Sequence, residues 1–492
     1  MGLGRKLTVV AAAVPTLAAL LAAPAGAAGI DWKPCPNATG VDCGTVTVPI
    51  DWANPSGGTI RLALARRKAT DPAHRIGSVL MDPGGPGGEG AAEVQDGWSL
   101  SPAITARFDT VGFDPRGVGR SNPVRCGLDA VTAPEHQLPR APREFRELAA
   151  RNRALADSCA KSTGPLADHV DTASVARDID AIRAALGESR LTYYGTSYGT
   201  LMGQEYAERY PDRVRAVVLD GTMDHSLRST WEFLSSQTRA TQEMFDQFAH
   251  WCATTSSCAL HGQDVHALMA SLYSRAERGQ LSTPDDPLDP VAFLGMVTRN
   301  FYGPSWDQLA TNLISLRDGK PAESAYGDIT VPTSFASIFC SDWHLPISGF
   351  GELQTFRYSL AAIAPDVRFS PLAWKSATGC IGWPGAVRDP QRRPGFLGQA
   401  PVLLLNSRYD PATPYEWAQH VSRQTGARLL TYDGAGHGAY FKNSPCVVST
   451  TDRFLIDGVL PGQGTHCAAV APSGARSGGL SLFAAGPRAT GQ

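Results

Sequence analysis

Short apolar runs alternate with longer amphipathic stretches along most of this chain. Eight of the runs have the length and the β-branched or aromatic content of strands. Several are apolar throughout and indicate buried strands, whereas one alternates apolar with polar positions and predicts a half-exposed strand. The alternating run covers residues 60–66, and the other seven cover residues 44–50, 77–81, 108–114, 191–194, 215–221, 401–406 and 428–432.

Helical periodicity separates several of these strands. From Asp171 to Leu186 the apolar residues fall on one stripe, and Gly187 follows at the position where a helix commonly ends. Another helical pattern begins just after residue 197 and continues to Pro211. Strands that alternate with helices in this way predict an α/β fold with a mainly parallel sheet and helices on both of its faces.

This alternation stops after residue 224. From about His225 to Cys340 no run is a convincing buried strand, and helical patterns cover residues 233–251 and 291–316. We therefore expect a helical cap over the carboxyl edge of the sheet, inserted before the last strands. The expected divisions are a first part of the core at 28–224, the cap at 225–345, a second part of the core at 346–470, and a loose tail rich in Gly, Ala and Ser at 471–492.

The first 27 residues predict export. Arg5-Lys6 precedes an apolar stretch at 7–23, and Ala25-Gly26-Ala27 has the pattern of a signal cleavage site. The stretch is too short and too rich in small residues for a membrane anchor, and no later run is long and apolar enough to span a bilayer. We therefore expect a secreted, extracellular protein without a stable membrane anchor.

The cysteines and the charge agree with that expectation. Ten cysteines suit disulfides in an exported protein, and the simplest pairing joins sequence neighbours. The chain has no C-x₂-C spacing and no histidines clustered with cysteines, so that neither a metal nor a cofactor is expected. With a net charge of −2 and no run of like charge, nothing predicts nucleic-acid binding, and we expect a monomer. The expected pairs are Cys35/Cys43, Cys126/Cys159, Cys252/Cys258, Cys340/Cys380 and Cys446/Cys467.

Ser197 is the candidate nucleophile. It lies in Gly195-Thr196-Ser197-Tyr198-Gly199, between the strand at 191–194 and a helical pattern. A serine at such a turn sits on a tight, strained corner with its hydroxyl exposed, and the flanking glycines let neighbouring backbone pass without a Cβ clash. The N-terminus of the next helix adds positive potential where an oxyanion would form. The alternative is an ordinary structural turn.

His437 is the candidate base, because a serine hydroxyl becomes a good nucleophile only when a base takes its proton. It lies in the loop Asp433-Gly434-Ala435-Gly436-His437-Gly438, directly after the last predicted strand. Such a loop can reach over the sheet edge towards Ser197. The alternative is a loop histidine that fixes a turn.

Asp410 is the candidate acid that orients the base. It follows the strand at 401–406 and lies between the serine and the histidine in chain order. Thr413-Pro414-Tyr415-Glu416 has the pattern of a capping box with proline at the first helical position, which predicts a helix that pins the loop of Asp410. The competing acid is Asp220, which otherwise caps a helix or fixes a turn.

Two backbone N–H groups should receive the oxyanion. We expect one from Tyr198, just past the serine, and the other from the loop after the strand at 77–81, where Gly85 is our choice. The glycines of this loop, Asp82-Pro83-Gly84-Gly85-Pro86-Gly87-Gly88, allow its backbone to approach a substrate closely. The loop taken by itself is also compatible with a Gly- and Pro-rich surface loop.

These motifs together resemble those of the α/β-hydrolases. Pro83-Gly84-Gly85-Pro86-Gly87 is similar to the H-G-G-P-G oxyanion motif of the proline iminopeptidase group, with Pro83 in place of the usual histidine. The longer form from Asp82 to Gly88 resembles that of the secreted bacterial tripeptidyl aminopeptidases. The segments at 113–121, 195–199, 410–414 and 436–438 are similar too, and the matches run from about residue 35 to residue 470 in the family's order.

The resemblance implies an α/β-hydrolase fold and a serine exopeptidase that releases short peptides, tripeptides above all, from free N-termini through an acyl-enzyme. In a cap that excludes water the terminal ammonium must meet carboxylates. Asp342, at the return from the cap to the core, is the first candidate for this role, with a helix cap as the alternative. Glu89 stands near the oxyanion loop where a small residue is expected. It is the second candidate, and the alternative is that this departure has no functional role.

Two other functions are compatible with the same residues. A carboxylesterase could use the same Ser-Asp-His set, because esterases share these motifs. An inactive binding protein that kept the fold is disfavoured by the intact set of Ser197, Asp410 and His437. A hydrolase with an aspartate nucleophile is disfavoured because serine occupies the turn.

Overall fold

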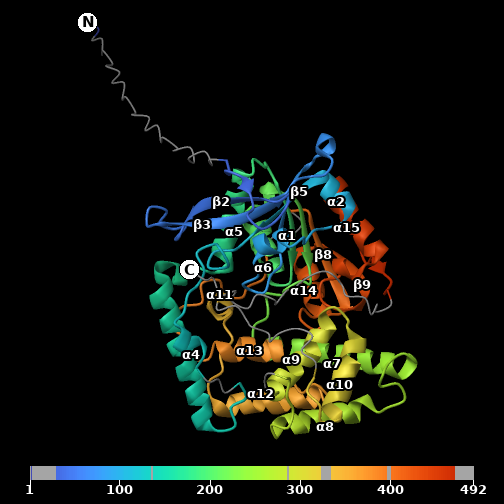
Figure 1. The fold of residues 1–492 in the computed structure, drawn as a ribbon. Coiled ribbons are helices and arrows are strands. Elements are labelled where there is room, and N and C mark those ends of the chain that lie inside the picture. The colour runs from blue at the N-terminus through green and yellow to red at the C-terminus, as the bar shows by residue number, and fades with distance from the viewer. Residues whose placement is uncertain are drawn as a thin grey trace.

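A mostly parallel sheet forms the centre of the protein (Figure 1). The computed structural model describes residues 2, 29–133, 137–284, 287–322, 334–395 and 400–470. The strands are β1 (Lys33–Pro34), β2 (Asp42–Pro49), β3 (Thr59–Arg67), β4 (Gly77–Asp82), β5 (Phe108–Phe113), β6 (Leu191–Thr196), β7 (Val214–Asp220), β8 (Val402–Tyr409), β9 (Arg428–Ala435) and β10 (His466–Cys467). Within the described residues they pair in the order β1-β2-β3-β5-β4-β6-β7-β8-β9-β10. The pairs β1–β2, β2–β3 and β3–β5 are antiparallel and the others are parallel.

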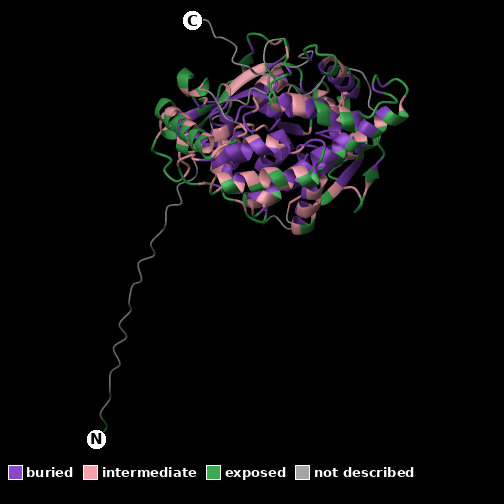
Figure 2. Cartoon of the chain, turned by 90° about the horizontal axis from the view of Figure 1, so that it is seen from below, coloured by how far each residue is buried: buried purple, intermediate pink, exposed green. Residues whose placement is uncertain are grey.

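Helices cover both faces of this sheet, as predicted. The helices that pack on the sheet are α1 (Gly90–Gln95), α2 (Pro102–Arg107), α5 (Thr172–Ala185), α6 (Tyr198–Arg209), α14 (Tyr415–Thr425) and α15 (Pro445–Asp457). Between β5 and α5 lie α3 (Leu128–Val131) and α4 (Pro142–Thr163), which contact each other. The predicted helix from Asp171 to Leu186 is confirmed as α5, with the Asp171 carboxylate accepting the Ser174 N–H as its N-cap. Figure 2 shows that buried residues concentrate in the strands and on the helix surfaces turned towards them.

The two faces of the sheet form two separate apolar cores. Successive residues of a strand point to opposite faces. Leu80, Tyr193 and Leu219 join one core with residues of α5 and α6. Their chain neighbours Met81 and Tyr194 join the other core with residues of α1, α2 and α15. The unbroken apolar runs of β4 and β6 therefore follow from burial on both sides.

The eight predicted strands are confirmed as β2 to β9. The expectation that residues 60–66 are half exposed is wrong at Ala63 and Ala65, which are buried like Leu62 and Leu64. The reason is tertiary, because β3 pairs with β2 and β5 along its two edges and α1 packs against it.

The chain between β7 and β8 is mainly helical over its described residues, with one isolated β-bridge between Ser282 and Pro287. It holds α7 (Thr230–Thr254), α8 (Val265–Glu277), α9 (Pro290–Tyr302), α10 (Trp306–Arg317), α11 (Ser334–Asp342), α12 (Phe350–Ile363) and α13 (Pro371–Gly379). Figure 1 shows α7–α10 gathered with α12 and α13 below the sheet, as expected of a cap. The helical pattern at 291–316 is split into α9 and α10.

The predicted cap boundary at residue 345 falls too early. The helices α12 and α13 lie in the segment 346–470 that was expected to be core, but they pack against α7 of the cap. The chain re-enters the sheet only at Val402. The helix α4 also reaches the cap, because the Asn152 Nδ2 group donates to the carbonyl oxygens of Thr378 and Ile381 at 3.0 Å each. The apolar stripe of a helix shows that the helix is packed, but not which layer it packs against.

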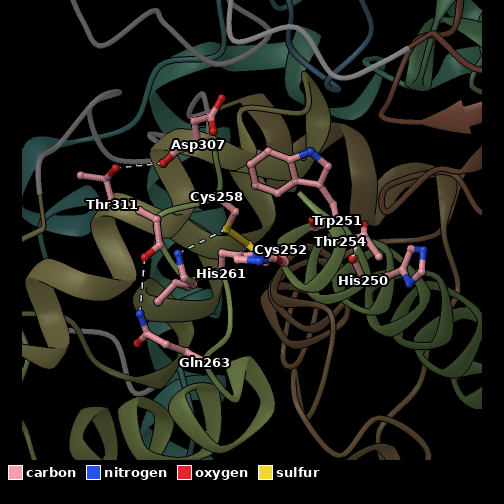
Figure 3. Close-up of a disulfide and its surroundings, with 11 residues drawn as sticks. His250, Trp251, Cys252, Thr254, Cys258, His261, Gln263, Asp307 and Thr311 are labelled. Carbon is pink, nitrogen blue, oxygen red and sulfur yellow. Dashed lines mark hydrogen bonds between the residues drawn. A yellow bond between two sulfur atoms is a disulfide. The ribbon is translucent and has the colours of Figure 1, made fainter. Parts of the chain in front are cut away.

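Five disulfides join the described cysteines, and they are the five predicted pairs. The pair Cys252–Cys258 closes the turn after α7 (Figure 3), where the His261 Nδ1 group donates to the Cys252 carbonyl oxygen at 3.0 Å. No helix in the described part of the chain is both long and apolar enough to cross a bilayer. The predicted signal segment at 1–27, apart from Gly2, and the predicted tail at 471–492 lie outside the described residues.

Candidate active site

Ser197 lies on a strained turn between β6 and α6. Its φ of 57° and ψ of −123° belong to a region that a residue with a side chain adopts only when the surrounding structure holds it there. The Ser197 N–H donates to the carbonyl oxygen of Asp220 on the neighbouring strand at 2.9 Å, and the Ser197 carbonyl oxygen accepts the Thr200 N–H at 2.9 Å. This is the geometry of a nucleophile elbow.

The glycine-rich loop after β4 lies directly against this turn. A Cβ atom on Gly84 would come within 2.4 Å of the Thr196 carbonyl oxygen and 2.7 Å of the Tyr198 nitrogen, so that only glycine permits this approach. Gly84 and Gly85 also have φ angles of +86° and +114°, which favour glycine. The structure therefore brings the loop of Gly85 next to Tyr198, the other expected oxyanion donor.

The buried carboxyl group of Asp82 supports this loop, and that of Asp114 lies nearby. Asp82, the last residue of β4, accepts the Gly84 N–H at 2.8 Å. Burial raises the pKa of Asp82 to about 8, and the charge of nearby Asp114 adds to the rise. Asp114 accepts the Arg120 N–H at 2.9 Å, and burial raises its pKa to about 7. The loop is therefore held by a hydrogen bond to the carboxyl group of Asp82, whose pKa burial raises.

His437 and Asp410 are in direct contact. The His437 Nδ1 atom lies 3.0 and 2.9 Å from the two Asp410 carboxylate oxygens, and both side chains are buried. Because a carboxylate accepts, Nδ1 carries the hydrogen and Nε2 keeps its lone pair. The Nε2 atom is buried and has no hydrogen-bond partner among the described residues. The imidazole therefore has the tautomer that a general base requires.

The His437 ring and Ser197 adjoin the same short segment at the end of β7. The Ser197 N–H donates to Asp220, and the next residue is Gly221. A Cβ atom on Gly221 would lie 2.9 Å from the His437 Cε1 atom. The backbone of the predicted nucleophile and the ring of the predicted base thus both adjoin the end of β7, although they lie far apart in the sequence.

Asp220, the competing acid, contacts the backbone of the histidine loop instead of the imidazole. Its carboxylate accepts the N–H groups of Ala439 and Tyr440 at 2.7 and 2.9 Å and the Tyr194 hydroxyl at 2.6 Å. It therefore holds the chain just beyond His437. Of the two acids, Asp410 is the one that touches the ring.

Three further hydrogen bonds hold Asp410 in place. The N–H groups of Ala412 and Thr413 donate to its Oδ1 atom at 2.9 Å each, and the Thr413 hydroxyl donates to its Oδ2 atom at 3.0 Å. The helix α14 begins at Tyr415 with Pro414 as its N-cap and has no side-chain cap bond. The predicted capping box is therefore wrong, because the threonine hydroxyl that would cap the helix donates to Asp410.

Known relatives align with nearly the whole chain. The serine protease Hip1 of Mycobacterium tuberculosis is 30% identical over 481 residues, which cover 89% of this chain and 91% of Hip1. A tripeptidyl aminopeptidase of Streptomyces lividans is 31% identical over 485 residues, which cover 92% of this chain and 89% of that protein. The chain belongs to the TAP-like family of serine hydrolases. The predicted α/β-hydrolase fold and the serine hydrolase class are thereby confirmed.

Two further matches agree with this assignment. The family described as TAP-like protein matches residues 366–467 of this TAP-like hydrolase, which run from just before α13 to the end of β10. A carboxylesterase B of Mycobacterium tuberculosis is 32% identical over 459 residues, which cover 87% of this chain and 86% of that protein. The relatives thus carry names of both peptidases and an esterase.

Asp342 of this TAP-like hydrolase has no exposed surface (0%). Its carboxylate accepts the Thr172 N–H and hydroxyl at 2.9 and 2.7 Å and the Tyr198 hydroxyl at 2.7 Å. The Thr172 N–H is one of the free donors at the start of α5, so that Asp342 also satisfies the end of a helix. These contacts favour the helix-cap alternative over the predicted role as an amine ligand.

Glu89 keeps part of its surface exposed beside the oxyanion loop. It is the N-cap residue of α1 and makes no side-chain cap bond there. Its Cγ atom lies 2.9 Å from the position of a Cβ atom on Gly119, next to Asp114. Of the two predicted amine ligands, only Glu89 is partly exposed.

Tyr302, at the end of α9, supports the histidine loop in a way that the sequence did not predict. Its carbonyl oxygen accepts the His437 N–H at 2.9 Å and the Lys442 Nζ group at 2.5 Å. Its ring also lies against the imidazole, with ring centroids 5.4 Å apart. Burial lowers the pKa of Lys442 to about 8. No sequence pattern joins position 302 to position 437, because the contact crosses from the cap to the core.

Proposed function

We propose that this chain is a secreted serine exopeptidase that releases short peptides, tripeptides above all, from the free N-termini of peptides and proteins. The observation that carries the proposal is the buried contact between Asp410 and His437, whose ring adjoins the segment that holds Ser197. The names of the relatives Hip1 and tripeptidyl aminopeptidase support peptide substrates. The five disulfides support an extracellular location.

The proposed reaction passes through an acyl-enzyme. The His437 Nε2 atom takes the hydroxyl proton while the Ser197 Oγ atom bonds to the peptide carbonyl carbon. The oxyanion accepts hydrogen bonds from the N–H groups of Tyr198 and Gly85. His437 then gives its proton to the leaving amine nitrogen as the C–N bond breaks. Water attacks the resulting ester with the same base, and Ser197 is regenerated while Asp410 keeps the imidazole oriented.

Exopeptidase action also requires a group that binds the substrate ammonium. We propose Glu89 for this role, since it follows the oxyanion loop directly and keeps exposed surface. Asp342 would instead act by positioning, because it accepts the hydroxyl of Tyr198. The helices of the cap would close the space around the amine end of the substrate.

The test compares a tripeptide p-nitroanilide with its N-acetylated form. We expect acetylation to lower kcat/KM by roughly 10²-fold, because a carboxylate left without its ammonium partner in a desolvated site is costly. Ser197→Ala, the matched control, should abolish turnover of both substrates. Equal cleavage of the free and acetylated substrates would refute the exopeptidase proposal while leaving a serine hydrolase in place.

A secreted carboxylesterase is the second candidate, and the relative named carboxylesterase B favours it. It predicts turnover of short-chain p-nitrophenyl esters far above that of any tripeptide anilide. Labelling with a sulfonyl fluoride separates both enzymes from an inactive binding protein. If the protein is an enzyme, the sulfonyl fluoride should label Ser197 in the parent protein, and this label should disappear in Ser197→Ala. An inactive protein should show no label at Ser197.

A further inference from the structure

A second cluster of titratable side chains lies where the chain leaves and rejoins the core. Glu205 belongs to α6, His225 to the segment that leads from β7 into the cap, and Asp389 to the segment that returns from α13 to β8. One ligand atom from each of the three lies within 4.8 Å of those from the other two. The residues are only 2%, 3% and 4% exposed, respectively.

Three polar atoms of this cluster are buried without a hydrogen-bond partner among the described residues. They are the Glu205 Oε2, His225 Nδ1 and Asp389 Oδ2 atoms. Buried polar atoms are nearly always paired, and each unpaired atom costs free energy. Three such atoms in one small cluster therefore indicate that something absent from the polypeptide satisfies them.

The tautomer of His225 makes all three atoms acceptors. Its Nε2 atom lies 2.8 Å from the Asp342 carbonyl oxygen. Because a carbonyl oxygen only accepts, Nε2 carries the hydrogen and Nδ1 presents a lone pair. Histidines that bind metals commonly donate their other ring N–H to a carbonyl or carboxylate in this way. The Trp343 ring packs edge-on against the imidazole, with centroids 4.6 Å apart, and helps to fix its orientation.

The neighbouring arginines leave these acceptors unsatisfied. Arg392 bonds to the Oε1 atom of Glu205 and, at 2.8 Å, to Glu208. Arg209 lies 4.0 Å from the Oε2 atom of Glu205, which is beyond hydrogen-bond distance. Two carboxylate oxygens and an imidazole nitrogen thus lie in one buried space, where a cation bound between them would relieve their mutual repulsion.

We propose that Glu205, His225 and Asp389 bind a divalent first-row transition-metal ion. One imidazole and two carboxylates suit Zn²⁺ and Mn²⁺, whereas Ca²⁺ and Mg²⁺ prefer oxygen ligands throughout. Bonds of about 2.0–2.2 Å in a tetrahedral zinc site place the ligand atoms about 3.4 Å apart, so that small side-chain rotations suffice. The expectation of no metal came from cysteine spacing, which does not reveal ligands spread over three distant segments.

The ion would clamp the cap to the core. Its ligands come from the helix after Ser197, from the entry into the cap and from the exit out of it. Backbone hydrogen bonds already align the entry and exit segments. The Arg392 N–H donates to the His225 carbonyl oxygen at 2.7 Å, and the Asp389 N–H donates to the Ser341 carbonyl oxygen at 3.1 Å. An ion that binds only the folded state stabilises it in proportion to the logarithm of its concentration.

The test uses the full secreted chain, stripped with a chelator and titrated with ZnCl₂. We expect one zinc ion per chain by calorimetry and native mass spectrometry, and a higher midpoint of thermal unfolding. His225→Gln keeps an N–H group for Asp342 but removes the Nδ1 lone pair, and Asp389→Asn removes one charge. Each should weaken zinc binding by at least about tenfold. Circular dichroism of the stripped variants checks that they fold; where one does not, Glu205→Gln replaces it.

The separate cluster of Asp246, His266 and Asp366 supplies the matched control. His266 lies 3.1 Å from both carboxylate oxygens of Asp366, and Gln242 donates to Asp366 and to Asp246, so that these groups already satisfy one another. His266→Gln should therefore bind zinc like the parent protein. The proposal is overturned if the parent binds no zinc, or if His266→Gln loses binding while His225→Gln keeps it. Either result is independent of peptidase activity.

Discussion

Replacing Asp410 by asparagine tests whether this carboxylate sets the tautomer of His437. The Oδ1 atom of Asp410 accepts two backbone N–H groups, and an amide oxygen can take its place. The amide nitrogen would then face the Thr413 hydroxyl and the His437 Nδ1 atom. Because an amide nitrogen only donates, Nδ1 would have to accept, and the ring hydrogen would move to Nε2.

An imidazole with its hydrogen on Nε2 cannot take the proton of Ser197. In addition, the positive ring that forms during attack would no longer face a negative charge. We therefore expect kcat to fall about 10⁴-fold, the loss that follows the same change in a serine protease triad. This corresponds to about 5.4 kcal/mol of transition-state stabilisation. KM should change little, because Asp410 is buried behind the imidazole.

Asp220→Asn is the matched control for this substitution. Asp220 is also a buried aspartate, but it bonds the backbone of Ala439 and Tyr440 and leaves the imidazole alone. We expect a lower unfolding midpoint and a loss in kcat of no more than about tenfold, because the loop loosens while the tautomer is kept. Steady-state kinetics on a tripeptide anilide and on a short ester measure both variants. The reasoning is refuted if Asp220→Asn loses more activity than Asp410→Asn.

Three further outcomes follow from the same contacts. Burial raises the pKa of Asp82 from 3.8 to about 8, so that within this range the folded state keeps a proton that the unfolded state has lost, and stability falls as the pH rises. Asp82→Asn keeps an acceptor for the Gly84 N–H, and its thermal unfolding midpoint should fall less than that of the parent between about pH 5 and pH 8. An equal fall in parent and variant would show that Asp82 does not cause the pH dependence. The bond between Cys340 and Cys380 closes a loop of 40 residues and so restricts the unfolded chain. Replacing both cysteines by alanine should lower the free energy of unfolding in urea by about 4 kcal/mol. An unchanged urea midpoint would contradict this account. Glu89→Gln should raise KM for a free tripeptide anilide but not for its acetylated form, and equal KM values in parent and variant would exclude Glu89 as the ammonium ligand.

Local patterns were sufficient for the features that depend on one segment at a time. The apolar runs located the central strands because each strand buries its own side chains on both faces. The turn at Ser197 was visible because a strand, two glycines and a helix stand next to one another in the chain. The neighbouring cysteine pairs were visible because a short loop brings its two ends together at little entropic cost.

The choice between Asp410 and Asp220 was decided by tertiary structure. Both stand at the ends of parallel strands that finish at the same edge of the sheet, and their local patterns do not show which one meets the ring. The position of the loop of His437, held by Tyr302 from the cap and by Asp220 from the core, decides it.

The role of Asp342 and the extent of the cap were also decided by tertiary structure. The place of Asp342 at the predicted return from the cap to the core made it a candidate, but only its contacts with Thr172 and Tyr198 show that its carboxyl group is used inside the protein. The helices α12 and α13 carry apolar stripes that could pack on the sheet or on α7. The sequence by itself determined which surfaces are buried and which residues can react. Packing between distant segments determined what those surfaces touch. Two segments that match in shape and charge need not show any pattern of apolar and polar residues that reveals the match.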